Sequence, residues 1–382
     1  MEQTKGSGMK YIIWVVIAIL VIWGGHSLIT KNSIPKETGP IKIGFIGPLS
    51  GDAAAYGEPI KNGIELAVNE INGKGGVDGR QIQMIYEDGK CSGKDSASAA
   101  QKLVNIDKVK YIIGGVCSGE AFGFSPITIE AKVFTIMPGA SAPKLSGVSP
   151  YLMRNNPNDN LVGVALADFI AKSHKSVFTI SEQTDFAQGI ESVFLAQVQK
   201  NKLTNSGTQS YDSKTTDFRS LLLKVKDANP DVVFINAQTG ANVLRIAQQA
   251  RQIGIKSQFV GTAFGPDPAV QAGGSAVEGM VFADAPGLAS EGAGKDLFTK
   301  YKATYGKDPA FAFYVGAAYD GVYLISKAVS SVGDDSNSVQ KYMHSISNYR
   351  GTIGTYSFDN NGDIVGIIPI FEKIVSGKLV GI

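Results

Sequence analysis

From residue 41 onward, short apolar runs alternate with longer stretches whose apolar residues recur at helical spacing. The run IKIGFIG at residues 41–47 is followed by residues 58–72, where the apolar residues fall on one face of a helix. This order of strand and helix continues to residue 137 and begins again after residue 160. Apolar strands that alternate with helices are typical of parallel sheets covered by helices. The two similar sets therefore predict two doubly wound α/β lobes rather than one large sheet. The length of 382 residues agrees, because a single core stops growing near ~250 to 300 residues.

The loops that follow the predicted strands are rich in small and polar residues. Six of them read GPLSG, GGVCSGE, MPGASAP, SEQTDF, INAQTG and GTAFG. A single loop of this kind is an ordinary tight turn, whereas six of them at the ends of strands indicate a binding site. Doubly wound sheets bind ligands at the carboxyl ends of their strands, and glycine lets backbone amides approach a ligand closely. The stretch IIGGVCSGEA at residues 112–121 is a buried strand that ends in glycines and a serine hydroxyl. It predicts a site for a small anionic group, which we expect to be a carboxylate.

Charge and motifs argue against several classes of function. The formal net charge is +2 and the first forty residues supply all of it, so the rest of the chain lacks the basic face that phosphate binding needs. Gly44, Gly47 and Gly51 miss the G-x-G-x-x-G spacing of dinucleotide sites, and no P-loop motif occurs. Two cysteines and three histidines make a poor set of metal ligands. We therefore expect no nucleic-acid partner, no cofactor and no metal.

A serine hydrolase is also disfavoured. The stretch from Gly139 to Pro143 is one residue short of the G-x-S-x-G motif around a nucleophilic serine. Such a serine needs a base, but His26 lies beside the N-terminal apolar segment, His174 follows a predicted helix and His344 lies in a polar-faced stretch. We expect no catalytic residues, so the chain is not predicted to be an enzyme.

Aromatic residues lie at or near the tips of several predicted loops. They are Tyr56, Phe122, Phe186, Phe264, Phe311, Phe313 and Tyr314. Each alone is typical of core packing, whereas aromatics on several loops at once form the walls of small-molecule clefts.

The segment Tyr11–Trp23 contains thirteen apolar residues without a break. This length fits a signal peptide, with a weak cleavage site at residues 25–27. Counting on to Ile29 gives nineteen residues, which nearly span the ~30 Å hydrocarbon core, so an uncleaved anchor at residues 11–29 is an equal alternative. Either reading places the body outside the cytoplasmic membrane. In an exported chain the two cysteines, Cys91 and Cys117, favour a disulfide, whereas in the cytosol they would be free thiols.

The chain resembles the periplasmic solute-binding proteins of the branched-chain amino acid (leucine/isoleucine/valine) ABC transporter family, from residue 41 to the C-terminus. The resemblance is carried by IKIGFIGPLSGDAAAYGEPIKNGIELAVNEINGKGGVDGRQIQMIYED, YIIGGVCSGEA, MPGASAP, the DF…LL…NPDVVF run at 217–234, ARQIG…FVGT and AYDG. It implies a type I periplasmic binding fold, in which two α/β lobes are joined by a three-strand hinge. When the family's layout is applied to this chain, residues 1–40 are expected to be the signal peptide or anchor and a linker. The first lobe is 41–157 plus 285–364, and the second is 158–284 plus 365–382.

The resemblance also assigns roles to residues. It places the ligand carboxylate on Ser118, Ala140 and Ser141, pairs Cys91 with Cys117 at the base of the first of these loops, and makes Tyr56 an aromatic wall that Phe186 closes from the other lobe. The full set of expected ligand-binding residues is Tyr56, Ser118, Gly119, Ala140, Ser141, Phe186, Gln238, Phe264 and Tyr314.

One position departs from the family pattern. Amino-acid binders usually carry a glutamate for the ligand ammonium in the loop after F-x-G, and this chain has Ala263 there. A buried ammonium without a carboxylate is costly. Either Glu182, Asp185 or Asp267 replaces the glutamate, or the ligand is an amide or a plain carboxylate rather than an α-amino acid.

The resemblance predicts an extracytoplasmic substrate-binding protein of an ABC importer. It would be a monomer on the periplasmic or extracellular face of the cytoplasmic membrane that closes its lobes on a small carboxylate-bearing solute and presents the closed form to the permease subunits. Two alternatives remain. One is a ligand-sensing receptor domain of the same fold, kept on the membrane by its N-terminal segment, and the other is an enzyme on the same scaffold.

Overall fold

The computed structural model describes residues 38–382, and the structural statements below concern this part of the chain. The apolar segment at residues 11–29, and with it the choice between signal peptide and anchor, lies outside the described residues. Within residues 38–382, no helix combines the length and the apolar character needed to cross a membrane.

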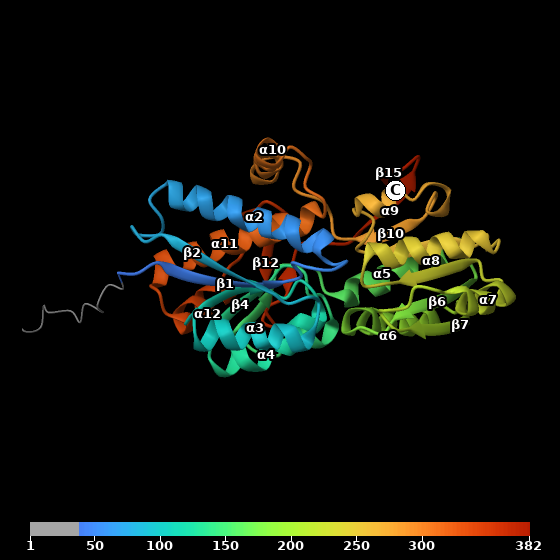
Figure 1. The fold of residues 1–382 in the computed structure, drawn as a ribbon, viewed down its shortest axis with the longest axis horizontal. Helices are drawn as coiled ribbons and strands as arrows, with labels where there is room; N and C mark the ends of the chain where they lie inside the picture. The colour runs from blue at the N-terminus through green and yellow to red at the C-terminus, as the bar shows by residue number, and fades with distance from the viewer. Residues whose placement is uncertain (1–37) are drawn as a thin grey trace, which may run out of the picture. The chain divides into compact units, whose positions relative to one another are not determined.

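The first sheet has five parallel strands in the order β2-β1-β3-β4-β5 (Figure 1). The strands are β1 (Ile41–Gly47), β2 (Ile82–Asp88), β3 (Tyr111–Gly114), β4 (Phe134–Met137) and β5 (Leu152–Arg154). Every residue of β3 and β4 is buried. Their residues do not alternate between apolar and polar because helices cover both faces of the sheet, and even the polar Thr135 of β4 is fully buried.

Two pairs of helices cover this sheet. Helices α2 and α11 pack against each other, as do α3 and α4, and Figure 1 shows the two pairs on opposite sides of the strands. Helix α12 packs against α11 and β4, and α10 against α2. The bounds are α2 (Ala54–Gly73), α3 (Gly93–Asn105), α4 (Ser118–Glu130), α10 (Ala293–Tyr305), α11 (Ala312–Val332) and α12 (Ser336–His344).

Helix α2 begins very close to the loop after β1. A Cβ atom built on Gly57 would lie 1.7 Å from the carbonyl oxygen of Pro48, so the backbone accepts no larger residue at this position. This close approach fixes the start of the helix at the carboxyl end of β1, where Tyr56 is buried.

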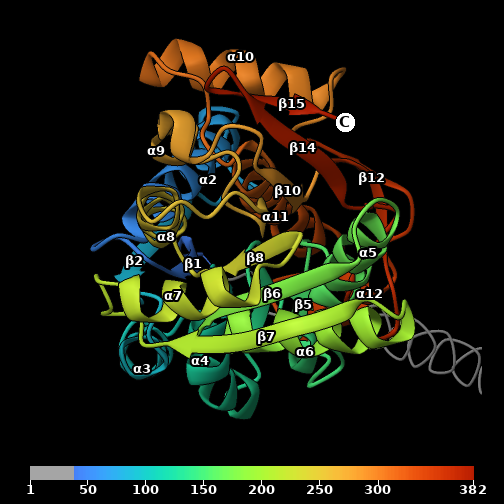
Figure 2. The same ribbon diagram turned by 90° about the vertical axis from the view of Figure 1, so that its right-hand side faces the viewer.

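The second sheet has seven strands in the order β15-β14-β10-β9-β8-β6-β7 (Figure 2). The strands from β10 to β7 are parallel, and the C-terminal hairpin β14–β15 adds to β10 in the antiparallel sense. The strands are β6 (Ser176–Glu182), β7 (Thr204–Tyr211), β8 (Val232–Asn236), β9 (Gln258–Thr262), β10 (Val281–Asp284), β14 (Ile370–Val375) and β15 (Lys378–Gly381). The helices of this region are α5 (Asp159–Ala171), α6 (Asp185–Lys200), α7 (Arg219–Ala228), α8 (Gly240–Gln252) and α9 (Pro268–Gln271).

Several of these helices begin directly after a strand, at a capping side chain. The Thr184 hydroxyl accepts a hydrogen bond from the amide of Ala187 at the start of α6, and the Thr239 hydroxyl accepts one from the amide of Asn242 at the start of α8. Such caps satisfy amides that have no partner inside the helix. They also turn the chain sharply at the carboxyl ends of β6 and β8.

A small antiparallel sheet completes the first lobe. It consists of β11 (Tyr349–Gly351), β12 (Gly354–Phe358) and β13 (Ile364–Val365). The chain passes between the elements of the two large sheets three times, between β5 and α5, between β10 and α10, and between β13 and β14. The predicted fold class of two doubly wound α/β lobes is confirmed. The predicted lobe boundaries at residues 157, 284 and 364 remain predictions.

Candidate functional site

A cavity lies among the loops at the carboxyl ends of both sheets. The space open in it to the centres of water-sized groups is about 40 Å³. Its lining comes from both lobes. The lining residues are Tyr56, Ile60, Val116, Cys117, Ser118, Gly139, Ser141, Phe186, Gln238, Ala263, Phe264, Phe311 and Tyr314.

The structure brings together most of the residues expected to bind a ligand. Seven of the nine line the cavity, the exceptions being Gly119 and Ala140. Ala140 is fully buried and its amide donates to the carbonyl of Gly115 at 2.8 Å, so it supports the loop from behind. That the seven bind a ligand stays a prediction.

Four lining residues besides Cys117 and Ala263 were not in the expected set: Ile60, Val116, Gly139 and Phe311. Ile60 reads from the sequence as part of the core face of its helix, and Val116 as an apolar residue inside a polar loop. Phe311 belongs to the aromatic group already noted at residues 311–314. That group was a usable signal, because one turn of a helix places Phe311 near Tyr314.

Ser118 is the donor best placed for an anionic group. Its side-chain oxygen accepts hydrogen bonds from the amides of Ser141 at 3.3 Å and Ala142 at 3.1 Å, and the residue is 1% exposed. Because these bonds use the oxygen as an acceptor, the hydroxyl hydrogen is left to donate. Ser118 is also the first residue of α4, where amides lack partners within the helix and the helix dipole is positive.

Ser141 is engaged differently from the expectation that it donates to a ligand. Its hydroxyl donates to the carboxylate of Asp159 at 2.9 Å, and its carbonyl accepts from the Asp159 amide at 3.0 Å. Asp159 is 2% exposed, and burial raises its pKa to about 7 against the opposing effects of the Ser141 hydroxyl and Arg154. Ser141 therefore joins the first lobe to the start of α5. Of the two serines expected to hold the ligand carboxylate, only Ser118 keeps a hydroxyl hydrogen available to donate.

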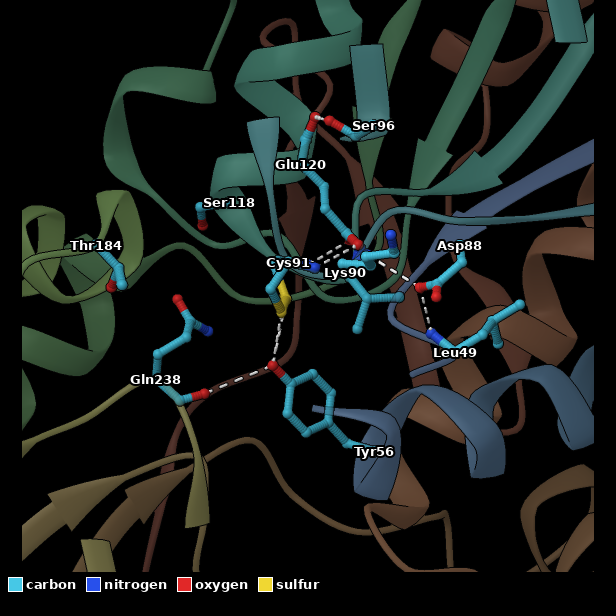
Figure 3. The surroundings of a disulfide bond; sticks show 12 residues. Leu49, Tyr56, Asp88, Lys90, Cys91, Ser96, Ser118, Glu120, Thr184 and Gln238 are labelled. Carbon is cyan, nitrogen blue, oxygen red and sulfur yellow. Dashed lines mark hydrogen bonds between the residues drawn. A yellow bond between two sulfur atoms is a disulfide. The ribbon is translucent and has the colours of Figure 1, made fainter. Parts of the chain in front are cut away.

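Cys91 and Cys117 form a disulfide, which confirms the predicted pair (Figure 3). The carboxylate of Glu120 accepts hydrogen bonds from the amides of Cys91 at 3.0 Å, Val116 at 3.2 Å and Cys117 at 3.1 Å. Glu120 is fully buried, and this burial raises its pKa to about 7 although the three amides oppose the shift. One carboxylate thus holds the backbone at both ends of the disulfide, directly before Ser118.

Tyr56 connects the disulfide to the second lobe (Figure 3). Its hydroxyl oxygen lies 2.8 Å from the sulfur of Cys91 and 3.2 Å from that of Cys117, and it donates to the carbonyl of Gln238 at 3.5 Å. The amide of Gln238 in turn donates to Glu182 at 2.8 Å. The predicted wall residue therefore also makes a contact between the lobes.

Three aromatic rings form one side of the cavity. The ring centroids of Tyr56 and Phe264 are 5.8 Å apart, those of Tyr56 and Phe311 are 5.7 Å apart, and those of Phe264 and Phe311 are 6.3 Å apart. These separations lie within the range of favourable aromatic pairs. The rings come from α2, from the loop after β9 and from the residue before α11, so both lobes supply this wall.

Ala263 lines the cavity at the position where a glutamate was the family expectation. It has a φ of +59°, a left-handed conformation that is uncommon and costly for a residue with a Cβ. None of the three carboxylates named as replacements lines this cavity. Glu182 accepts from Tyr211, Gln238 and Asn242, Asp267 caps α9 through the amide of Ala269, and Asp185 borders a different cavity.

Among residues 38–382, no group of three or more His, Cys, Asp or Glu side chains is arranged to hold a metal ion. The arrangement can instead bind a small solute by a hydroxyl donor, a helix N-terminus and apolar walls.

The chain is similar to several known proteins. Residues 40–372 match the profile of a family described as periplasmic binding protein. The Leu/Ile/Val-binding protein homolog 2 of Brucella abortus is 31% identical over 359 residues, which cover 91% of this chain and 91% of that protein. The structure of a leucine-binding protein from Thermotoga maritima has a TM-score of 0.83 and 25% identity, with 90% of this chain and 97% of that one covered. A solute-binding protein of an ABC transporter from Rhodopseudomonas palustris, in complex with 3,4-dihydroxybenzoic acid, has a TM-score of 0.79 and 25% identity, with 90% and 96% covered.

Proposed function

Because the chain belongs to the periplasmic binding protein family, we propose that it is the extracytoplasmic substrate-binding protein of an ABC importer and binds a small carboxylate-bearing solute between its lobes. The observation that carries the proposal is the position of Ser118. Its hydroxyl is free to donate, it begins α4, and it lines a cavity with aromatic walls. The relatives named for leucine, isoleucine and valine, and the structure with a dihydroxybenzoic acid, support a carboxylate as the shared feature of the ligand.

Binding works by closure of the lobes. Residues of both lobes line the cavity, so a ligand reaches its full set of contacts only when the lobes are together. Such a ligand shifts the population toward the closed form by its differential affinity for that form. The closed form is what the permease subunits recognise, and no chemical step on the solute is required.

The test is a ligand panel on the purified full chain. The panel contains the aliphatic amino acids, short amides, and aliphatic and aromatic carboxylates, and the readout is the shift in thermal unfolding followed by calorimetric titration. A ligand at about 100 times its dissociation constant adds ~2.7 kcal/mol of stability. We expect stabilisation by carboxylates and none by amides of the same carbon skeleton. Stabilisation by the amides alone would contradict the proposal.

Replacement of Ser118 by alanine tests the carboxylate contact directly. Loss of one hydrogen bond to a charged group weakens binding by ~1.5 to 3 kcal/mol. The matched control is Ser125→Ala, a buried serine of the same helix that does not line the cavity. Equal carboxylate affinity in the Ser118→Ala and Ser125→Ala variants would exclude Ser118 from the site.

Export and anchoring have a separate test. We propose that the body lies on the outer side of the cytoplasmic membrane, as expected for this family. N-terminal sequencing of the protein recovered from cells distinguishes a cleaved signal peptide from an anchor, because retention of residues 11–29 is expected for the anchor alone.

A further inference from the structure

A second, smaller cavity adjoins the proposed ligand site. The two cavities share Ser141, Phe186, Ala263 and Tyr314 in their linings. The space open to the centres of water-sized groups in the smaller cavity is about 20 Å³. Since one such group needs at least ~10 to 15 Å³, the cavity has room for a single small group.

Two polar atoms at this cavity have no hydrogen-bond partner within the described part of the chain. They are the Oδ2 atom of Asp284 and the hydroxyl oxygen of Thr262, and both residues are 3% exposed. The other oxygen of Asp284 accepts from the amide of Ala285 at 2.7 Å and from the hydroxyl of Tyr314 at 3.4 Å. A buried acceptor without a partner is costly, so this pair of atoms favours a donor that enters from the neighbouring site.

The acidic groups that line the cavity are the carboxyls of Asp159 and Asp284. Burial raises the pKa of Asp284 to about 7, with a further increase from Glu372 and opposing effects from Ala285 and Tyr314. Asp159 borders the same cavity, and its neighbour Arg154 is held by both carboxylate oxygens of Asp363. None of the described residues that line the cavity is a lysine or an arginine. A positively charged group therefore fits here better than a neutral one.

We propose that this cavity binds the amino group of the ligand, with the carboxylate of Asp284 and the hydroxyl oxygen of Thr262 as acceptors. The proposal rests on the proposed function and narrows its ligand to amino acids. Asp284 takes the role of the glutamate that Ala263 replaces, from the end of β10 rather than from the loop after β9. Because Ser141 and Tyr314 line both cavities, the amino group lies next to the carboxylate end of the ligand, as in an α-amino acid.

The experiment compares each amino acid with its analogue lacking the amino group, by calorimetric titration of the full chain. The pairs are leucine with 4-methylpentanoate, alanine with propanoate, and phenylalanine with 3-phenylpropanoate. The wild-type protein is expected to bind the amino form roughly 10- to 150-fold more tightly, the range for one hydrogen bond to a charged group. The Asp284→Asn variant is expected to lose this preference while it keeps its affinity for the plain carboxylate.

Two further variants separate the subsite from general effects. Glu372→Gln removes a negative charge that acts on Asp284 but does not line the cavity, and it should retain the preference. Thr262→Val preserves the shape of the side chain and removes the second acceptor, so the preference should fall but not vanish. If Asp284→Asn does not fold, Thr262→Val together with the wild-type pairs still decides the question.

Three results would overturn the proposal. Equal binding of both members of each pair to the wild-type protein would exclude an amino-group subsite and leave the proposed function standing. Equal weakening of both members in Asp284→Asn would assign Asp284 a structural role. A third result is that both members bind equally and that this binding requires sodium chloride, which choline chloride cannot replace. This result would assign the cavity to an inorganic cation. Failure of the proposed function itself would look different, because neither member of any pair would bind.

Discussion

Replacement of Glu120 by glutamine tests how the loop that presents Ser118 is held. The carboxylate accepts from three buried amides, two of which belong to the disulfide cysteines. Glutamine keeps the shape, but its amide nitrogen cannot accept a hydrogen bond, whereas both oxygens of the carboxyl keep lone pairs that accept even when it is protonated, so in the variant at least one of the three amides loses its partner. At low pH the variant is therefore expected to be less stable than the wild type by ~1 to 3 kcal/mol.

The pH dependence of the same comparison gives a sharper prediction. Burial raises the pKa of Glu120 from 4.5 to about 7 in the folded protein. Between these values the folded state holds a proton that the unfolded state has released, so the free energy of unfolding falls as the pH rises. At 1.36 kcal/mol for each pH unit, this fall amounts to ~3 kcal/mol between pH 4 and pH 8. The variant has no proton to release at this position, so its disadvantage should shrink with pH and be close to zero or reversed at pH 8.

The assay is urea unfolding of both proteins, followed by circular dichroism at one-unit steps from pH 4 to pH 8. Other buried carboxylates are present in both proteins, so the difference between the two free energies isolates Glu120. The control for the loss of a charge is Glu58→Gln, an exposed position on α2. A difference between wild type and Glu120→Gln that stays constant across this range would refute the reasoning.

Two further predictions concern stability. Gly57→Ala should destabilise the protein by ~3 kcal/mol, because its Cβ would overlap the carbonyl oxygen of Pro48, whereas Gly73→Ala in the same helix, with no atom within 4 Å of its Cβ, should be neutral or slightly stabilising in the same unfolding assay. Equal effects of the two alanines would contradict the close approach. Replacement of Cys91 and Cys117 by serine opens a loop with a sequence separation of 26 and should cost ~3 to 4 kcal/mol in chain entropy, measured by urea unfolding with dithiothreitol-treated wild type as the comparison.

Much of the fold follows from local sequence. The strands of parallel sheets are buried on both faces, so β3 and β4 are fully buried and mostly apolar, and each strand ends where small residues allow a sharp turn. These two signals lie within a few residues of each other along the chain. They therefore predicted both the lobes and the loops that meet at the candidate site, including Ser118 and Gln238.

The parts that were missed depend on contacts between distant segments. Ile60 has the helical spacing of a core residue, and the sequence does not show that this helix start faces a cavity rather than the sheet. Asp284 ends a short strand without any motif, and only the packing of β10 beside β9 places it near Thr262 and the loop of Ser141. The sequence also could not show that the Ser141 hydroxyl donates to Asp159, because Asp159 lies at the start of α5, after the chain has passed from the first sheet to the second.

The two ends of the proposed ligand site come from different lobes, and this links the chemistry of the ligand to closure. Ser118 begins a helix on the first sheet, whereas Asp284 ends a strand of the second. A ligand with both a carboxylate and an amino group satisfies both ends only when the lobes are together. The hydrogen bond from Tyr56 to Gln238 is 3.5 Å long and contributes little to closure by itself. The rings of Tyr56 and Phe264 also meet across the lobes, and a bound ligand adds its own differential affinity for the closed form to these contacts. A carboxylate without an amino group leaves Asp284 and Thr262 unpaired, so it shifts the lobes toward the closed form less than the matching amino acid does.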